Sequence, residues 1–280
     1  MLDERGVADV ERIIRAVAAE EIMPRFRRLA AADITEKTGP DNLVTVADRA
    51  AEVALARQLT PLVPGSIVVG EESVAEDPAL LDTLDGDAPV WIVDPIDGTH
   101  NFATDNPRFT VLVALSHRGR LLASWTFAPA FDMLATAVAG GGATLDGRPL
   151  RIGPAPTDLR HLDVGTPQQR WWTSADRSRF NTLCGYGVSL SFFDTTGLEY
   201  VELAAGRRTS IVVTWDNPWD HAAGVLLVTE AGGAVTAADG RPYRPAADNV
   251  LPMVAAPDAD CAARLHAAML DEYPGRTARA

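Results

Sequence analysis

Residues 91–102 read Trp-Ile-Val-Asp-Pro-Ile-Asp-Gly-Thr-His-Asn-Phe, and the candidate chemistry of this chain is organised around them. The apolar run before Asp94 predicts a buried strand that delivers this carboxylate, and Pro95 predicts a turn after it. Asp97 follows three residues later, so both carboxylates can face one point. Gly98 lets the backbone approach a ligand closely, and Thr99 adds a hydroxyl. Carboxylates beside backbone amides at a helix start are typical of a metal and phosphate site. From these residues alone, a strand end followed by a turn with solvated aspartates stays open as the alternative.

Two further carboxylates stand at comparable places in the chain. Glu71 follows the short β-branched run 66–70, which predicts a second buried strand. Asp220 lies in the first turn of a helix that is predicted to start near Pro218. All four acidic side chains offer oxygen and none offers sulfur, which favours Mg²⁺, Mn²⁺ or Ca²⁺ over zinc. Like charges gathered at strand ends repel one another unless cations lie between them.

The remaining pattern predicts an α+β protein. Apolar residues at helical spacing predict a first helix over 5–31, and Thr45 is placed to cap a second helix that ends near Leu59. Three strand-like runs then predict an antiparallel meander, and they are 110–115, 121–127 and 133–138. The second half predicts helices over 166–181, 198–205, 218–231 and 258–270, with strands at 211–213 and 250–255. We place a subdivision near residue 150, which gives an N-terminal half (1–150) with most metal ligands and a C-terminal half (151–280) that completes one catalytic unit.

Composition narrows the function classes. The chain has 280 residues, and 25 Lys and Arg against 38 Asp and Glu give a net charge of −13. This acidic balance argues against a nucleic-acid-binding face, which needs basic residues. No run is long and apolar enough to predict a membrane span or a signal peptide, and the two cysteines show no metal or redox spacing. We therefore expect a cytoplasmic protein with no membrane partner.

Four sequence blocks resemble the inositol monophosphatase family of Mg²⁺-dependent, lithium-sensitive phosphatases. The blocks are Lys37–Asp48, Gly70–Ser73, Trp91–Phe102 and Trp219–Gly233, in the family's order. The third and fourth together are highly specific, and the resemblance covers nearly the whole chain. It implies a layered αβαβα sandwich of the inositol monophosphatase and fructose-1,6-bisphosphatase type, usually a homodimer.

The resemblance also implies roles for individual residues. Glu71, Asp94 and the Ile96 carbonyl would hold a first Mg²⁺, and Asp94, Asp97 and Asp220 a second. Glu71 would help to hold a weaker third ion, and Mn²⁺ is a possible substitute. The Gly98 and Thr99 amides would receive phosphate oxygens. Thr99, paired with Asp48, would orient a water, activated by the metals, that attacks phosphorus directly without a covalent intermediate.

Several neighbouring residues have simpler interpretations. We expect His100 and His221 to pack or support rather than to bind metal, because adjacent residues on a helix point about 100° apart. Asp216 suits a helix cap before Pro218 and ranks below Asp220 as a ligand. Lys37 belongs to a matching block and could neutralise the acidic site. Cys184 is expected to be a small buried residue rather than a nucleophile.

The sequence departs from the family where the substrate alcohol would bind. Members selective for myo-inositol have a glutamate seven residues before the helix aspartate, where this chain has Val213. A valine cannot accept hydrogen bonds from hydroxyls. Asp194-Thr195-Thr196-Gly197 stands where a Gly-Ser/Thr-Ala-Ala run is common, so Thr196 and Val213 are candidate substrate-pocket positions beside Asp97, Gly98, Thr99 and Asp220. Inositol 1-phosphate is therefore not assured as the preferred substrate.

Several functions remain as alternatives. The substrate could be a small inositol phosphate-like ester, histidinol phosphate, fructose 1,6-bisphosphate or 3′-phosphoadenosine 5′-phosphate. An aspartyl-phosphate mechanism is disfavoured, because it would want a second aspartate two residues after the nucleophile, whereas Asp97 follows Asp94 by three. A regulatory protein that retains the fold is an alternative of another class, since some members of the family are associated with transcription complexes.

Overall fold

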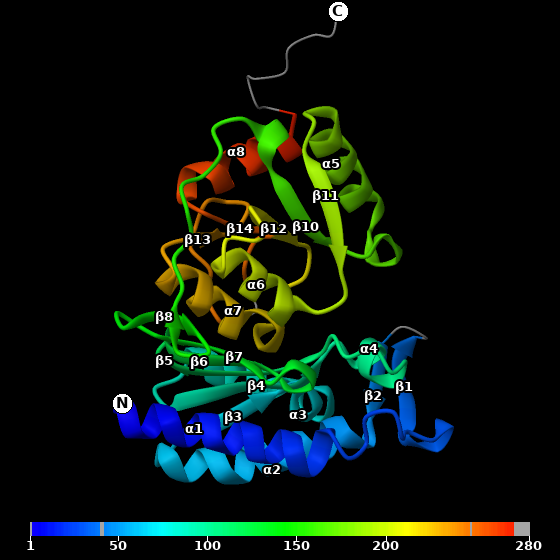
Figure 1. Cartoon of the computed structure of the whole chain (residues 1–280), viewed down its shortest axis with the longest axis vertical. Coiled ribbons are helices and arrows are strands. Elements are labelled where there is room, and N and C mark those ends of the chain that lie inside the picture. Colours follow the sequence, from blue (N-terminus) through cyan, green and yellow to red (C-terminus); the bar gives the residue numbers. More distant parts are fainter. Residues whose placement is uncertain (1, 40–41, 247, 272–280) are drawn as a thin grey trace, which may run out of the picture.

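The computed structural model describes residues 2–39, 42–246 and 248–271, and it shows alternating layers of helix and sheet. Figure 1 shows five layers stacked along the long axis: a helix pair, a sheet, a second helix pair, a second sheet and a third helix pair. This α+β layering is the predicted αβαβα sandwich. It arises because each sheet has two apolar faces, and each face is covered by helices.

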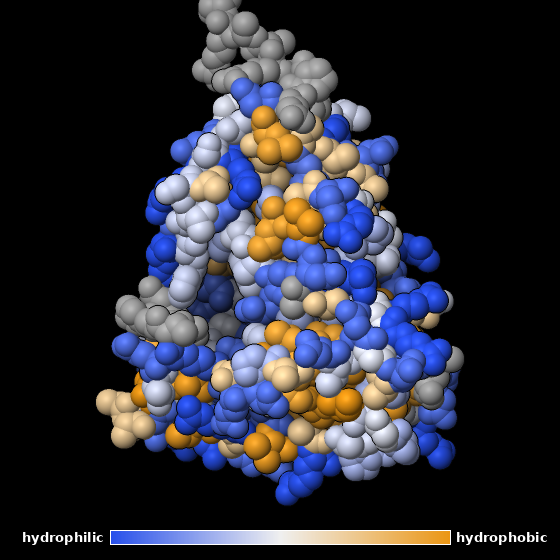
Figure 2. Space-filling view, turned by 180° about the vertical axis from the view of Figure 1, so that it is seen from behind, coloured by the Kyte–Doolittle hydropathy of each residue, from blue (hydrophilic) through white to orange (hydrophobic). Residues whose placement is uncertain are grey.

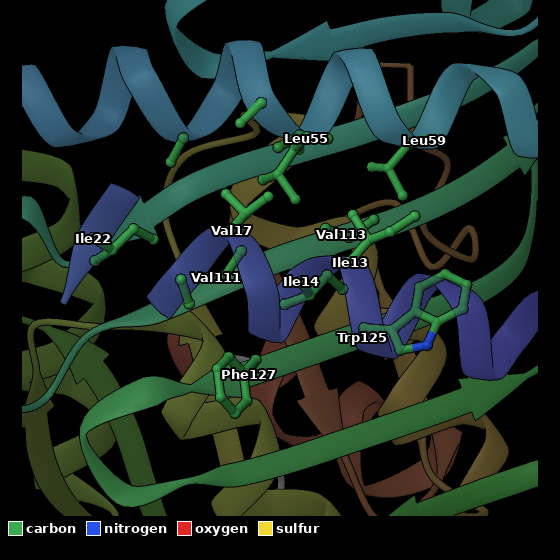
Figure 3. Close-up of a cluster of buried hydrophobic side chains, with 14 of the residues drawn as sticks. Ile13, Ile14, Val17, Ile22, Leu55, Leu59, Val111, Val113, Trp125 and Phe127 are labelled. Atoms are coloured by element: carbon green, nitrogen blue, oxygen red, sulfur yellow. The ribbon is translucent and has the colours of Figure 1, made fainter. Parts of the chain in front are cut away.

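The first helix layer holds α1 (Glu4–Val17) and α2 (Val46–Leu59). Their apolar side chains pack on one face of the first sheet, where Figure 3 shows Ile13, Val17 and Leu55 beside Val113 and Trp125. Thr45 caps α2 as predicted, since its hydroxyl accepts a hydrogen bond from the Ala47 amide. The start of α2 also carries Asp48, so this packing positions a candidate site residue.

The first sheet has seven strands in the order β3-β4-β5-β6-β7-β8-β9. Strands β3 and β4 are parallel and the other neighbours are antiparallel, which confirms the predicted meander. The bounds are β3 Ile67–Gly70, β4 Pro89–Asp97, β5 Thr110–His117, β6 Arg120–Ala128, β7 Met133–Val138, β8 Gly142–Leu145 and β9 Arg148–Pro149.

The middle layer holds α6 (Thr196–Ala204) and α7 (Pro218–Glu230). Both helices are apolar around most of their circumference, because each has a sheet on either side. Gly224 of α7 permits a close approach to α6, since a Cβ there would lie 2.1 Å from Cδ2 of Tyr200. This layer brings the C-terminal half against β4 and β5, where Asp94 and Asp97 lie.

The second sheet has five strands in the order β11-β10-β12-β14-β13, and α5 and α8 cover its outer face. The bounds are β10 Asp163–Pro167, β11 Ser189–Phe193, β12 Ser210–Val213, β13 Ala234–Thr236, β14 Met253–Ala256, α5 Ser174–Gly185 and α8 Ala259–Met269. Outside the layers lie a hairpin and two short helices. Their bounds are β1 Ile34–Gly39, β2 Asn42–Thr45, α3 Glu71–Glu76 and α4 Thr99–Ala103.

Outside the candidate site, predictions of local structure are wrong at three places. The first helix does not run to residue 31: α1 passes into a π-helix at Ala18–Ile22 and helical structure stops before Pro24, whose ring cannot continue a helix. The α-helix predicted over 166–181 spans Ser174–Gly185, because Thr173 caps it, β10 extends to Pro167 and a short 3-10 helix occupies Gln169–Trp171. Cys184 is exposed rather than buried, whereas Cys261 is buried.

Two other predictions concern the chain ends and turns. The cluster Gly39-Pro40-Asp41-Asn42 is typical of a turn, and a frayed tail is expected from Pro274 onward; Pro40, Asp41 and the tail lie outside the described residues. Within the described part of the chain, no helix combines the length and the apolar character that crossing a membrane requires.

Candidate functional site

A bulge in β4 brings Asp94 and Asp97 to the same face of the first sheet. Residues three apart on a regular strand point to opposite faces. Here Asp94 pairs with Leu112 and Asp97 pairs with Thr110, so the partner strand advances by two residues while β4 advances by three. The extra residue is a β-bulge, a device that redirects side chains. The strand therefore continues through Pro95, where the sequence predicted a turn.

Asp220 completes a cluster of three carboxylates. Each of Asp94, Asp97 and Asp220 offers an oxygen, and these oxygens lie within 4.8 Å of one another. Asp94 and Asp97 are buried, at 1% and 5% exposure. Asp220 arrives from the first turn of α7, where a carboxylate also suits the positive end of the helix dipole. Three residues predicted as metal ligands are thus brought together from two halves of the chain.

Asp97 is held from both halves. Its carboxylate accepts hydrogen bonds from the Thr110 hydroxyl at 2.7 Å and from the backbone amides of Thr196 at 3.0 Å and Gly197 at 2.8 Å. Thr196 therefore lies at the site as predicted, but its amide is committed to Asp97. These contacts fix the Asp97 carboxylate relative to α6 without the help of a ligand.

Glu71 faces the site from the start of α3 and is paired with Lys37. The Lys37 ammonium lies 2.8 Å from Glu71 Oε1 and 2.6 Å from Glu72 Oε1. Both Lys37 and Glu71 line the same cavity as the three aspartates. Lys37 thus neutralises part of the acidic site.

The start of α3 is fixed by Glu52, a residue that the sequence analysis missed. Its carboxylate accepts hydrogen bonds from the amides of Glu72 and Ser73, each at 2.8 Å. Gly70 makes room for it, since a Cβ at residue 70 would lie 2.3 Å from the Glu52 carboxyl carbon. Glu52 lies on α2 one turn after Asp48, and this spacing on a buried helix face was the available signal.

Asp48 and Thr99 meet as the resemblance implies. The Thr99 hydroxyl lies 3.2 Å from Asp48 Oδ1 and 3.0 Å from the Ile96 carbonyl oxygen. Asp48 also accepts a hydrogen bond from the Thr45 amide at 2.8 Å. Burial raises the pKa of Asp48 to about 7, and the nearby charge of Glu71 adds to this effect. The group can therefore exchange a proton near neutral pH.

Asp220 has two hydrogen-bond donors that the sequence analysis did not assign. The Trp215 indole Nε1 lies 2.7 Å from Asp220 Oδ2, and the Asn217 amide Nδ2 lies 3.0 Å from the same oxygen. Asp216 does not cap α7, since Asn217 occupies the cap position. The Asp216 carboxylate instead accepts two hydrogen bonds from Asn249, one from its backbone amide at 2.7 Å and one from its side-chain Nδ2 at 2.8 Å.

The two histidines occupy different surroundings. His221 is fully buried between Tyr200 and Trp215, and burial lowers its pKa to about 3, so it is neutral. This confirms a packing and supporting role. His100 lines the cavity, and its Nδ1 has no hydrogen-bond partner among the described residues.

A cavity of about 880 Å³ opens above the carboxylates. The space-filling view in Figure 2 shows a hollow between the two halves of the molecule. Besides the acidic cluster, the cavity is lined by aromatic side chains, namely Trp171, Phe193, Trp215 and Trp219, and by charged side chains, namely Arg170, Asp176 and Asp194. Val213 does not line the cavity; it is 2% exposed and packs in the core, while the next residue, Thr214, faces the cavity.

The crowded carboxylates predict a pH-dependent stability in the absence of metal. Burial, followed by the charges of Glu71 and Asp97, raises the pKa of Asp220 to about 7, against about 3.9 for an unfolded aspartate. The folded state therefore binds more protons than the unfolded state between about pH 4 and 7, so this contribution to stability is lost as the pH rises through that window. Glu71, Asp94 and Asp97 also have raised pKa values.

We expect Asp220→Asn to be more stable than the unsubstituted protein in chelator at pH 8, with the difference vanishing near pH 4. Thermal unfolding at a series of pH values measures this difference. Buried His221, whose pKa is lowered, changes the stability with pH in the opposite direction. This effect is present in both proteins, so it cancels when their stabilities are compared. A difference that does not grow with pH would contradict the prediction.

Comparisons with known proteins place this site in a family. The model of the inositol monophosphatase family matches residues 3–272. An inositol monophosphatase of Dictyostelium discoideum is 34% identical over 208 residues, which cover 71% of this chain and 74% of that protein. The Nus factor SuhB of Pseudomonas aeruginosa is 33% identical over 223 residues, or 78% of this chain and 80% of that protein.

A solved structure shows the same fold. The Thermotoga maritima IMPase superposes with a TM-score of 0.79 at 24% sequence identity, and the match covers 97% of this chain and all of that one. The sequence relatives extend over most of the chain, and the residues matched by the family model include the whole acidic cluster. This chain therefore belongs to the inositol monophosphatase family, whose members act on small phosphorylated substrates, and it is a phosphoric monoester hydrolase.

Proposed function

We propose that this chain is a Mg²⁺-dependent phosphomonoesterase that hydrolyses a small phosphorylated alcohol resembling an inositol phosphate. The observation that carries the proposal is the group of three carboxylates, two of them buried, whose oxygens lie within 4.8 Å of one another in the cavity lining. An acidic group of this kind attracts a hard divalent cation, and a phosphate ester can reach the cation through the cavity.

The donor set fits the proposed metal. All candidate side chains offer oxygen. The pKa values of Asp94 and Asp220 are raised by burial and, after it, by repulsion between the carboxylates, which a cation would relieve. Glu71, Asp94 and the Ile96 carbonyl would hold one ion, and Asp94, Asp97 and Asp220 a second. Glu71 would share a weaker third ion, for which it would have to leave Lys37 at least in part. Mn²⁺ is a possible substitute, and lithium is expected to inhibit by competing at one of these positions.

Bound Mg²⁺ would lower the pKa of water and stabilise charge on the transferring phosphoryl group. The chain's own residues would position the reactants. The backbone amides of Gly98 and Thr99 would hold phosphate oxygens. Thr99 would orient the attacking water, and Asp48, which lies 3.2 Å from the Thr99 hydroxyl, would hold the proton that is displaced. Water would then attack phosphorus directly, and the alcohol would leave.

The two halves of the chain would work as one catalytic unit, with residues 1–150 supplying most ligands and 151–280 completing the site. The contacts of Thr196 and Gly197 with Asp97 support this division of labour. We also propose a cytoplasmic homodimer, which cell fractionation and light scattering of the purified protein would test.

The substrate specificity is expected to differ from that of myo-inositol-selective members. Val213 lies in the core and offers no hydrogen bond, and aromatic side chains contribute to the cavity wall beside Arg170 and Asp194. A myo-inositol ring would therefore lack the glutamate acceptor that selective members provide at the position of Val213. Histidinol phosphate, fructose 1,6-bisphosphate and 3′-phosphoadenosine 5′-phosphate are the competing esters.

The test is phosphate release from these four classes of ester, with Mg²⁺ and with chelator. We expect turnover only with Mg²⁺, and no strong preference for myo-inositol 1-phosphate over the other esters. A large preference for myo-inositol 1-phosphate would refute the specificity argument. Absence of turnover on every ester, with Mg²⁺ bound, would refute the proposed reaction and favour a regulatory role. That role is the second candidate because the Pseudomonas relative is named a Nus factor.

A further inference from the structure

The hydrogen bonds to Asp220 are concentrated on one of its two oxygens. Trp215 Nε1 lies 2.7 Å from Oδ2, and Asn217 Nδ2 lies 3.0 Å from it. A carboxylate oxygen has two lone pairs, so two donors satisfy Oδ2. The other oxygen, Oδ1, is then the one left to a cation. An indole is a donor only, so it can orient a carboxylate but cannot compete with it for the metal.

Trp215 is itself held firmly from both sides. Its ring centroid lies 5.2 Å from that of His221 and 6.3 Å from that of Phe193. The Trp215 carbonyl oxygen lies 3.0 Å from His221 Nε2, and Tyr200 Oη lies 3.2 Å from His221 Nδ1. Since a carbonyl can only accept, the neutral ring must carry its proton on Nε2, and Nδ1 accepts from the Tyr200 hydroxyl. A chain of contacts therefore runs from α6 through α7 to the indole.

We propose that Trp215, assisted by Asn217, is a positioning residue that presents a single oxygen of Asp220 to the metal site. This inference rests on the proposed metal-dependent function. Removing a partner that orients a metal ligand commonly lowers metal affinity by about 10–100-fold. The free ligand is then less ordered, and ordering it offsets part of the binding free energy. Trp215 also lines the cavity that the carboxylate cluster lines, so it lies where the proposed metal ions and a bound substrate would meet.

The decisive variant is Trp215→Phe, which keeps an aromatic ring against His221 and Phe193 but removes the N–H. We expect Mg²⁺ binding, measured by calorimetry on the full chain without substrate, to weaken by about tenfold or more. The Mg²⁺ concentration for half-maximal activity should rise in parallel, while kcat at saturating Mg²⁺ changes much less. A residue with only a structural role would lower the amount of active protein and leave Mg²⁺ affinity unchanged.

Trp171→Phe is the matched control. Trp171 lines the same cavity and is 47% exposed, but its ring lies beside Arg170 rather than a carboxylate of the cluster. Its substitution should leave Mg²⁺ affinity unchanged. Asn217→Ala removes the second donor from an exposed position and should weaken Mg²⁺ binding in the same direction; it carries the test if Trp215→Phe does not fold.

The outcomes separate this inference from the proposed function. Unchanged Mg²⁺ affinity in Trp215→Phe, or in Asn217→Ala if that variant alone folds, overturns the positioning role even if the unsubstituted enzyme is fully Mg²⁺-dependent. An unsubstituted protein that neither binds Mg²⁺ nor releases phosphate refutes the proposed function instead. An equal loss of affinity in Trp171→Phe would show that any change in the cavity wall perturbs the metal, which also overturns the specific role of the indole.

Discussion

Replacing Asp94 with asparagine should lower kcat by about a thousandfold or more, which corresponds to at least about 4 kcal/mol of barrier. Asp94 is the carboxylate proposed to bind both principal ions, so its loss would remove a ligand from each. The neutral amide has almost the same shape and can stay in the same buried place. Phosphate release at saturating Mg²⁺, compared with the unsubstituted enzyme, measures the effect.

The same variant should fold well in the absence of metal. The pKa of Asp94 is raised well above its usual value by burial and by the charges of Glu71, Asp97 and Asp220. Removing a buried charge that is repelled by its neighbours should therefore lower the free energy of unfolding little or not at all. Thermal unfolding in chelator should therefore show an unchanged or raised midpoint, and a strongly reduced response to Mg²⁺.

Asp94→Asn also separates the enzyme from the regulatory alternative. A phosphatase loses its function when this carboxylate is lost, whereas a protein that acts through its surface can keep a binding partner. Retention of more than a tenth of the phosphatase activity would contradict the assignment of Asp94 as a shared ligand.

Gly197→Ala should both destabilise the protein and impair the reaction. A Cβ at residue 197 would lie 2.5 Å from the Thr110 hydroxyl oxygen and 2.6 Å from Cδ2 of Leu112. Overpacking of this kind typically costs about 1–3 kcal/mol of unfolding free energy. The added methyl group would also push α6 away from β5, and the Gly197 amide would then lose its 2.8 Å hydrogen bond to Asp97.

Denaturant unfolding and Mg²⁺-dependent phosphate release together test this prediction. We expect a stability loss of about 2–3 kcal/mol, near the upper end of that overpacking range, and at least a tenfold loss of activity under conditions where the variant is still folded. Gly185→Ala is the control, since a Cβ at residue 185 meets nothing within 4 Å. Equal behaviour of the two variants would mean that the contact between α6 and β5 does not set the position of Asp97.

Much of the fold could be predicted because local signals agreed with the global pattern. Thr45 begins α2, Pro218 begins α7, and the β-branched runs form β3 and the centre of β4. These predictions succeeded because a cap, a proline or an apolar period acts within one or two turns of its own position. The first helix was predicted too long, because apolar periodicity continues past Pro24. The start of α5 was predicted too early, because no local signal showed that the chain up to Pro167 pairs as a strand.

The candidate site could likewise be predicted only in part. The four sequence blocks named Glu71, Asp94, Asp97 and Asp220, and the residue types alone indicated a hard metal. No local signal could show that a bulge against Thr110 and Leu112 turns Asp94 and Asp97 to one face, because a bulge is defined by the partner strand. Nor could the sequence place Val213 in the core rather than in the cavity wall.

The sequence by itself thus determined which groups are candidates for the chemistry, since the kind of side chain fixes which ions and protons it can hold. Only the tertiary structure decided how those groups are oriented. Glu52 supports α3 from twenty residues away, the amides of α6 hold Asp97 from across the molecule, and Trp215 fixes one oxygen of Asp220. Orientation depends on hydrogen bonds between segments that meet only when the layers pack, and such contacts leave no periodic or compositional trace in the chain.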